Sequence, residues 1–212
     1  ESRGSEMCIR DRKMDFLGLR TLTVIHDTEM AVRHTKDPDF RVANIDYDDP
    51  ATYEMLTRGE TMGIFQLEST GMTQVLMSMR PKNLEDVIAL ISLYRPGPMD
   101  SIPTYLRNRK DPSKVVYQTP QMAHIVDVTN GVVIYQEQVM QIAQKLAGYS
   151  LGQADILRKA MGKKKKEVLD QQFKGFRQGM IDNGYSEESI KALWDVCLLY
   201  TSPSPRDSTS SR

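Results

Sequence analysis

Residues 136–163, QEQVMQIAQKLAGYSLGQADILRKAMGK, contain the pattern that decides the fold class. In the first half, apolar residues recur three and four positions apart: Val139, Ile142, Ala143 and Leu146. The second half continues this spacing: Leu151, Ala154, Leu157 and Met161. Gly148 separates the halves, and Ser150 with Gln153 has the form of a capping box that starts a helix. The stretch therefore predicts two consecutive amphipathic helices joined by a tight turn.

The same helical spacing recurs along most of the chain. Further helices are expected over the approximate ranges 19–30, 50–59, 70–79, 84–91, 169–182 and 187–194. Side chains suited to an N-cap precede several of them: Asp49, Ser69, Asn83 and Ser186. Strand patterns are few. Only residues 13–17 show a clear alternation of polar and apolar side chains, and residues 63–67 are expected to form a buried extended segment. The predicted fold class is therefore mainly α.

The composition narrows the class of protein. The chain has 212 residues, 28 basic and 28 acidic side chains and 7% aromatic residues, as in soluble globular proteins. No apolar run approaches the roughly 20 residues that a membrane span needs, so no membrane partner is expected. Cys8 and Cys197 are too few for a disulfide framework or a zinc site. These features predict a soluble, cytoplasmic protein.

The two ends of the chain differ from its middle. Residues 1–12 and 197–212 have no helical or strand period, and the final stretch is rich in Ser, Thr, Pro and Arg. Both strings resemble translated sequencing adapters that border metagenomic reads. We therefore expect residues 1–12 and 197–212 to be non-native segments.

Positive charge is concentrated after the middle of the second predicted helix. Residues 158–177 contain eight basic and two acidic side chains, including Arg158, Lys159 and the run Lys163–Lys166. Several cations on one surface suit a polyanion, because each neutralised phosphate releases counterions. Gly162 would let a phosphate approach the backbone. The same residues also fit a solvated, lysine-rich helix end, so charge alone leaves both interpretations open.

Two other segments could face an anion. Pro96 and Pro98 stiffen the turn that follows Arg95, and a stiff turn could hold that guanidinium at a fixed angle to a ligand. Tyr135 and Gln136 stand at a predicted helix start, where free N–H groups favour anions. Simple redirection of the chain and simple capping explain these two segments equally well.

Three further patterns carry less specific signals. Asp46 and Asp48 have an Asp-x-Asp spacing that could chelate Mg²⁺ on a strand, but a loop is expected over 34–50. Ser150 lies in a Gly-x-Ser-x-Gly pattern, which requires a preceding strand where a helix is predicted. Lys13 and Asp15 are expected to share one face of a strand. An ordinary surface ion pair and a metal–phosphate site are both compatible with that last pair.

Five blocks of this sequence, in order, resemble the bacterial DNA polymerase III alpha-subunit family, the C-family replicative polymerases. The blocks are KMDFLGLRTLTVI, GIFQLES, LYRPGPM, YQEQVMQIA and GYSLGQADILRKAMGKKK, and the likeness covers roughly residues 13–195. The resemblance implies that residues 13–33 are the end of a palm domain, with a residual strand, and that residues 34–196 are a helical fingers domain. It also implies that the chain is a fragment of a DNA-directed DNA polymerase.

The resemblance further implies roles for individual residues. Asp15 matches one of three metal-binding aspartates, with Lys13 beside it, and two Mg²⁺ ions are expected in the complete enzyme. The triphosphate of a deoxynucleotide would be contacted by Arg158, Lys159, Lys163 and Lys164, with Arg95, Tyr135 and Gln136 bordering the pocket. Primer–template DNA, the sliding clamp and the clamp loader are the implied partners. Because the paired aspartates are expected upstream of residue 13, the fragment alone is predicted to be inactive.

A different class of function remains open at this point. The Lys163–Lys166 surface could belong to a non-enzymatic helical module that binds nucleic acid through its charge. Such a module would bind DNA in a strongly salt-dependent way but would not select a nucleoside triphosphate. A serine hydrolase using Ser150 is a third and more distant alternative.

Overall fold

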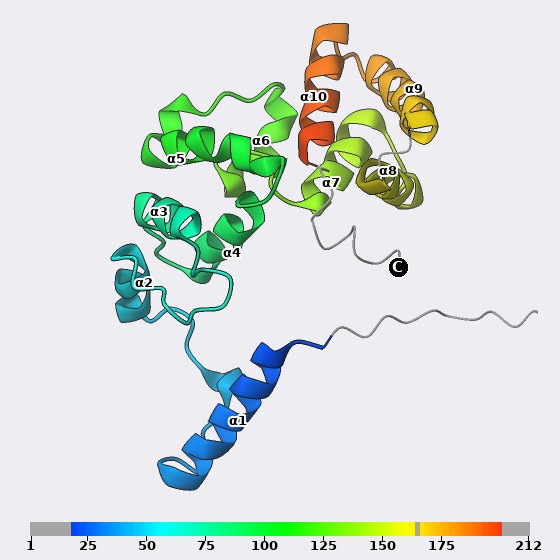
Figure 1. Ribbon diagram of the computed structural model, residues 1–212. Coiled ribbons are helices and arrows are strands. Elements are labelled where there is room, and N and C mark those ends of the chain that lie inside the picture. The colour runs from blue at the N-terminus through cyan, green and yellow to red at the C-terminus, as the bar shows by residue number, and fades with distance from the viewer. Residues whose placement is uncertain (1–17, 164–165, 201–212) are drawn as a thin grey trace, which may run out of the picture. The chain divides into compact units, whose positions relative to one another are not determined.

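A computed structural model of the chain describes residues 18–163 and 166–200 (Figure 1). Its internal contacts divide the chain into two compact units, Glu1–Asp46 and Tyr47–Arg212. This division falls after Asp46, whereas the resemblance places a domain boundary after residue 33.

The first unit is built on one helix, α1 (Arg20–Thr35). A short 3₁₀ turn, η1 (Val42–Asn44), follows it, and the Val42 N–H donates to Glu29 Oε2 at 2.9 Å. The helix predicted over 19–30 is thus confirmed. No residue of α1 is buried, and Leu22 is 60% exposed. The strand predicted over 13–17 lies outside the described residues.

All regular secondary structure among the described residues of the second unit is helical. Its α-helices, in chain order, are α2 (Pro50–Thr57), α3 (Thr70–Met79), α4 (Leu84–Leu93), α5 (Ile102–Lys110), α6 (Ala123–Val126), α7 (Gln136–Ala147), α8 (Leu151–Lys163), α9 (Lys166–Asp182) and α10 (Glu187–Tyr200). Short 3₁₀ turns connect several of them, including η2 (Pro98–Ser101). The mainly α fold class is therefore confirmed. The expected extended segment over 63–67 is wrong, because these residues form turns in which Gln66 adopts a left-handed φ of 66°.

The predicted caps start their helices through side-chain hydrogen bonds. The Asp49 carboxylate accepts from the N–H groups of Ala51 and Thr52, before Pro50 at the first position of α2. Ser69 and Asn83 accept from the third residue beyond them in the same way. These bonds satisfy N–H groups that have no partner inside a helix. Local chemistry thus decides where α2, α3 and α4 begin.

The second unit contains two hydrophobic cores. The first is formed by α2 to α5 and by Val132 and Ile134, with Leu76, Leu90 and Leu93 almost fully buried. The second is formed by α6 to α10, where α7 packs against both α8 and α9 (Figure 1). Burial of each large apolar side chain contributes about 1.5–3 kcal/mol. The cores hold the starts of α7 and α8 in fixed positions.

Close packing in the second core depends on one glycine and one aromatic cluster. A Cβ added at Gly179 of α9 would lie 2.0 Å from the carbonyl oxygen of Ala147, so only glycine lets α9 pass the end of α7. The ring of Trp194 lies 5.1 Å from that of Phe173 and 5.4 Å from that of Phe176, centroid to centroid. These contacts join α9 to α10 beside α7.

Helix α10 continues past residue 196, where the fingers segment was expected to end. Cys197 is fully buried in the second core, and burial raises the pKa of its thiol to about 12. The thiol therefore remains protonated at neutral pH. Residues 201–212, the rest of the segment predicted to be non-native, lie outside the described residues, as do residues 1–12.

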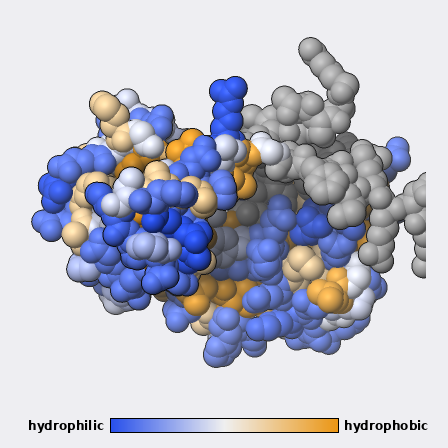
Figure 2. Space-filling model, turned by 90° about the horizontal axis from the view of Figure 1, so that it is seen from below, coloured by the Kyte–Doolittle hydropathy of each residue, from blue (hydrophilic) through white to orange (hydrophobic). Residues whose placement is uncertain are grey.

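Most of the visible surface is hydrophilic. Figure 2 shows hydrophobic residues as separate patches among hydrophilic ones. Within the part of the chain that the structure describes, no helix is both long enough and apolar enough to cross a bilayer.

Candidate nucleotide-binding site on α7 and α8

The start of α7 is fixed by a buried glutamine. Gln138 Oε1 accepts from the N–H groups of Ile134 at 2.7 Å and Tyr135 at 2.9 Å. Its Nε2 donates to the carbonyl oxygen of Ile125 and to Thr129 Oγ1. The amide thus uses two acceptor and two donor positions, which is its full capacity. It ties the first turn of α7 to the chain that precedes it.

The start of α8 is fixed by the predicted capping box. Ser150 Oγ accepts from the Gln153 N–H at 3.3 Å, and Gln153 Oε1 accepts from the Ser150 N–H at 2.9 Å. The confirmed box follows α7 and the left-handed Gly148 rather than a strand. Ser150 therefore lacks the strand-to-helix context that a nucleophile elbow requires.

Arg158 of α8 reaches across to the first residue of α7. Its Nε and Nη2 donate to Asp155 Oδ1 at 3.1 and 2.7 Å, and its Nη1 donates to Gln136 Oε1 at 3.2 Å. Two of the predicted site residues, Arg158 and Gln136, are thus in direct contact. A guanidinium has five N–H groups, so these bonds hold its orientation and leave two N–H groups for a ligand.

Asp155 also holds the neighbouring cation. Lys159 Nζ lies 2.6 Å from Asp155 Oδ2, and Arg158 occupies the other oxygen. Hydrogen bonds from Lys159, and then from Arg158, lower the pKa of the Asp155 carboxyl group. The carboxylate therefore stays ionised to a lower pH than an ordinary aspartate, and its hold on both cations weakens only as the pH falls through this lowered pKa. The three side chains together carry one net positive charge.

The electrostatic environment of the Arg158 guanidinium favours the binding of an anion. The guanidinium is only partly exposed, with 31% of its side chain accessible, so its charge is less screened than that of a free surface arginine. It also lies beside the N-terminus of α7, where helical N–H groups carry partial positive charge. The geometry is suited to holding phosphate oxygens through charge-assisted hydrogen bonds.

The other predicted site residues stand apart from this contact or cannot be placed. Tyr135 immediately precedes α7, and its N–H is bound by Gln138. Arg95 is exposed in the turn before η2, and among the described residues no hydrogen bond joins it to Arg158 or Gln136. Lys163 is the last residue of α8. Lys13, Asp15 and Lys164 lie outside the described residues.

Two residues of the site, Asp155 and Gln138, were not identified from the sequence. Asp155 precedes Arg158 by three residues and Lys159 by four, which is the spacing of helical ion pairs, so a signal for it was present. Gln138 stands three residues after Tyr135, where a glutamine can accept from the N–H before a helix, so a local signal was present for that bond. Its bonds to Ile125 and Thr129 had none, because they are set by the tertiary fold.

The described residues do not form a metal centre. They contain no group of three or more His, Cys, Asp and Glu side chains that could hold an ion. Asp46 and Asp48 lie in a loop rather than on a strand, and Asp49 is engaged as the cap of α2.

Gln138→Met is expected to lower the free energy of unfolding by about 2 kcal/mol, because it keeps the volume but leaves buried N–H and C=O groups without partners. Urea denaturation of the chain measures this change. Gln141→Met is the matched control, since Gln141 is exposed on the same helix. Equal stability of the two variants would show that Gln138 does not anchor α7.

Comparisons with known proteins agree with the architecture. The family described as the bacterial DNA polymerase III alpha subunit finger domain matches residues 21–184. This match begins inside the 13–33 segment that the resemblance assigned to the palm.

Curated relatives are similar to this chain over most of its length. The DNA polymerase III subunit alpha of Staphylococcus aureus (strain Mu50 / ATCC 700699) is 47% identical over 188 residues, 89% of this chain and 18% of the relative. That of Mycobacterium leprae (strain TN) is 48% identical over 192 residues, 88% of this chain and 16% of the relative. The chain thus spans less than a fifth of the length of these relatives. It belongs to the bacterial DNA polymerase III alpha-subunit family, and its residues 21–184 match the finger domain of that family.

Proposed function

We propose that the α7–α8 site binds the triphosphate of an incoming deoxynucleotide in a template-directed DNA polymerase that contains this chain. In this reaction the primer 3′-hydroxyl attacks the α-phosphate and pyrophosphate leaves. The observation that carries the proposal is the Arg158 guanidinium, held between Asp155 and Gln136 with two N–H groups left for phosphate oxygens.

Each residue has a distinct role in this proposal. Arg158 donates to the triphosphate, and Asp155 with Gln136 keeps its planar group oriented, so little reorganisation is needed when the charge arrives. Lys159 adds a second cation one residue further along α8. Lys163 and Lys164 would extend this charge, while Arg95 and Tyr135 would border the same pocket.

The proposal also gives Asp15 the role of a catalytic carboxylate. Asp15 would be one ligand of a two-ion Mg²⁺ site, and Lys13 would stand beside it. When bound, Mg²⁺ supplies charge neutralisation at the triphosphate and lowers the pKa of the attacking hydroxyl. The described residues contain no competing set of metal ligands.

The proposed partners follow from the same function. Primer–template DNA and deoxynucleoside triphosphates would be the substrates, and the sliding clamp and clamp loader would bind the complete enzyme. Base pairing would select the nucleotide, so phosphate contacts matter more to the protein than base-edge contacts. We place the complete enzyme in the cytoplasm, where bacterial replication occurs.

Arg158→Ala in a complete polymerase that contains this segment should raise the KM for a deoxynucleotide about 10- to 100-fold, because it removes charge-assisted hydrogen bonds worth about 1.5–3 kcal/mol. Steady-state primer extension measures this change. Lys174→Ala is the control, because Lys174 is exposed on α9 and the proposal gives it no role in the site.

The same experiment separates the proposal from a nucleic-acid-binding module. Primer–template affinity should be nearly unchanged in Arg158→Ala. A loss of DNA affinity with an unchanged KM for the deoxynucleotide would contradict the triphosphate site and favour the module instead.

A further inference from the structure

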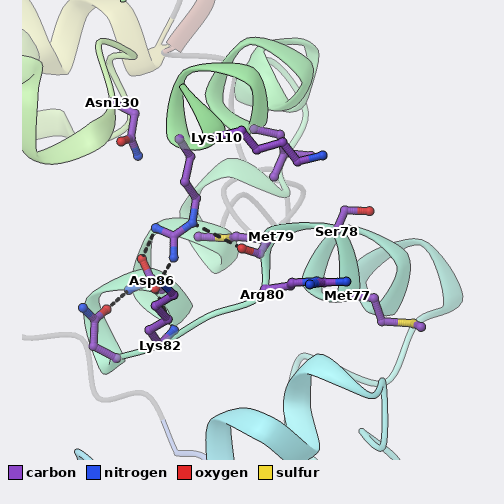
Figure 3. Close-up of a pocket in the computed structure, with 11 residues that line it drawn as sticks. Met77, Ser78, Met79, Arg80, Lys82, Asp86, Lys110 and Asn130 are labelled. Carbon is purple, nitrogen blue, oxygen red and sulfur yellow. Dashed lines mark hydrogen bonds and ion pairs between the residues drawn. The ribbon is translucent and has the colours of Figure 1, made fainter. Parts of the chain in front are cut away.

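A second cluster of positive charge lies in the other half of the helical unit, around a pocket of about 830 Å³ between the end of α3, the start of α4 and the end of α5 (Figure 3). Its lining includes four basic side chains, Arg80, Lys82, Arg109 and Lys110, and one acidic side chain, Asp86. None of these residues belongs to the α7–α8 site. The pocket falls within the size range of ligand-binding cavities.

The base of the pocket is a partly buried ion pair between Asp86 and Arg109. Asp86 accepts from Arg109 Nη1 at 2.5 Å and from Arg109 Nη2 at 2.6 Å, and Arg109 Nε donates to the carbonyl oxygen of Met79. Asp86 also accepts from the Lys82 N–H at 2.8 Å. Figure 3 shows the bonds of the guanidinium to Asp86 and to the Met79 carbonyl oxygen as dashed lines. The only carboxylate of the lining is thus neutralised by Arg109.

The other cations of the lining are Arg80, Lys82 and Lys110. Among the described residues, none of the carboxylates forms an ion pair with Arg80, Lys82 or Lys110. All three are exposed, and Lys110 lies on the opposite side of the pocket from Lys82 (Figure 3). The pocket lining therefore carries exposed positive charge from two separate segments of the chain.

The backbone at Arg80 supports a role for its side chain. Arg80 ends α3 in the left-handed conformation with a φ of 52°, a position that glycine usually occupies. A long, charged residue is strained there. Pro81 follows and is buried, so the chain leaves the helix sharply and Arg80 stands at the rim of the pocket.

We propose that this pocket, defined by Arg80, Lys82 and Lys110 over the Asp86–Arg109 pair, binds the phosphate backbone of single-stranded nucleic acid. Its lining contains no aromatic side chain on which a base could stack. Recognition would therefore be through phosphate and independent of sequence. A concave site admits a flexible single strand, whereas a rigid duplex presents a convex surface. The inference is independent of the proposed triphosphate site.

The test uses the full chain and a fluorescent oligothymidylate of about 20 nucleotides, long enough to exceed a typical single-strand site. The pocket variant is Lys82→Gln with Lys110→Gln and Arg80→Gln. The control variant, Lys145→Gln with Lys174→Gln and Lys191→Gln, removes the same charge from exposed positions on α7, α9 and α10. Circular dichroism establishes that both variants are folded, and the double variant at Lys82 and Lys110 replaces the triple one if Arg80→Gln alters the fold.

Anisotropy titration should show about tenfold weaker binding for the pocket variant, with affinity close to the unchanged chain for the control. The slope of log affinity against log salt should fall by about 2, since three single-strand contacts are lost. In the unchanged chain, bound oligomer should protect Lys82 and Lys110 from acetylation. An equal loss in both variants, or acetylation of these lysines unaffected by the oligomer, would overturn the proposal.

Two further probes distinguish which kind of molecule supplies the phosphate that binds in the pocket. An abasic oligomer of the same length should bind as well as oligothymidylate, and thymidine triphosphate should compete poorly at equal phosphate concentration. Weak binding of the abasic oligomer would show that bases are read. Strong competition by the triphosphate would assign the pocket to a free nucleotide. Either outcome contradicts a backbone site.

Discussion

Asp86→Ala is expected to lower the free energy of unfolding by about 3–5 kcal/mol, among the largest effects that a single substitution has in this domain. The Asp86 side chain is only 9% exposed and that of Arg109 only 22%. Removal of the carboxylate leaves a poorly solvated guanidinium with no counter-charge. It also removes the acceptor for the Lys82 N–H at the start of α4. Urea denaturation of the chain measures the loss.

The adjacent carboxylate provides the control. Glu85→Ala also removes one negative charge from the first turn of α4, but Glu85 is exposed, so a loss within about 0.5 kcal/mol is expected. The double variant Asp86→Leu with Arg109→Met should lose less than the sum of the two single variants, because no charge is then left unpaired. Additive losses would show that the pair is not coupled.

In the complete polymerase, Asp15→Asn should lower the turnover number by about two to four orders of magnitude. The substitution removes a charged ligand of the proposed Mg²⁺ site, which stabilises the transition state by several kcal/mol, and each 1.4 kcal/mol changes the rate tenfold. Single-turnover primer extension measures the chemical step apart from product release.

The matched substitution is Asp27→Asn, which removes the same charge from an exposed position on α1 and should leave the turnover number within about twofold. The melting temperature of Asp15→Asn should match that of the unchanged enzyme. Near-normal turnover by a folded Asp15→Asn enzyme would remove Asp15 from the catalytic site.

The sequence predicted those parts of the fold that local chemistry controls. Asp49, Ser69, Asn83 and Ser150 start helices as expected, because an N-cap depends only on residues within the next turn. Most of the periodic apolar residues of 136–161 lie in the second core for the same reason: their spacing alone defines one face of each helix. Leu151 is an exception, since it is 64% exposed despite its periodic position.

The sequence could not predict what depends on distant residues. The apolar composition of 63–67 suggested a buried extended segment, but Phe65 is exposed and only Leu67 is fully buried. Asp86 and Arg109 are 23 positions apart and meet only through the packing of α4 against its neighbours. Arg158 and Gln136 were each singled out, yet their contact depends on how α7 and α8 cross.

The most direct test of the central claim is the dissociation constant of a deoxynucleotide for the complete polymerase, bound to a primer that lacks a 3′-hydroxyl so that no chemistry follows. The Arg158→Ala enzyme should bind the deoxynucleotide about 10- to 100-fold more weakly than the unchanged enzyme, while Lys174→Ala binds it normally. The same dissociation constant for all three enzymes would contradict a triphosphate site at the crossing of α7 and α8.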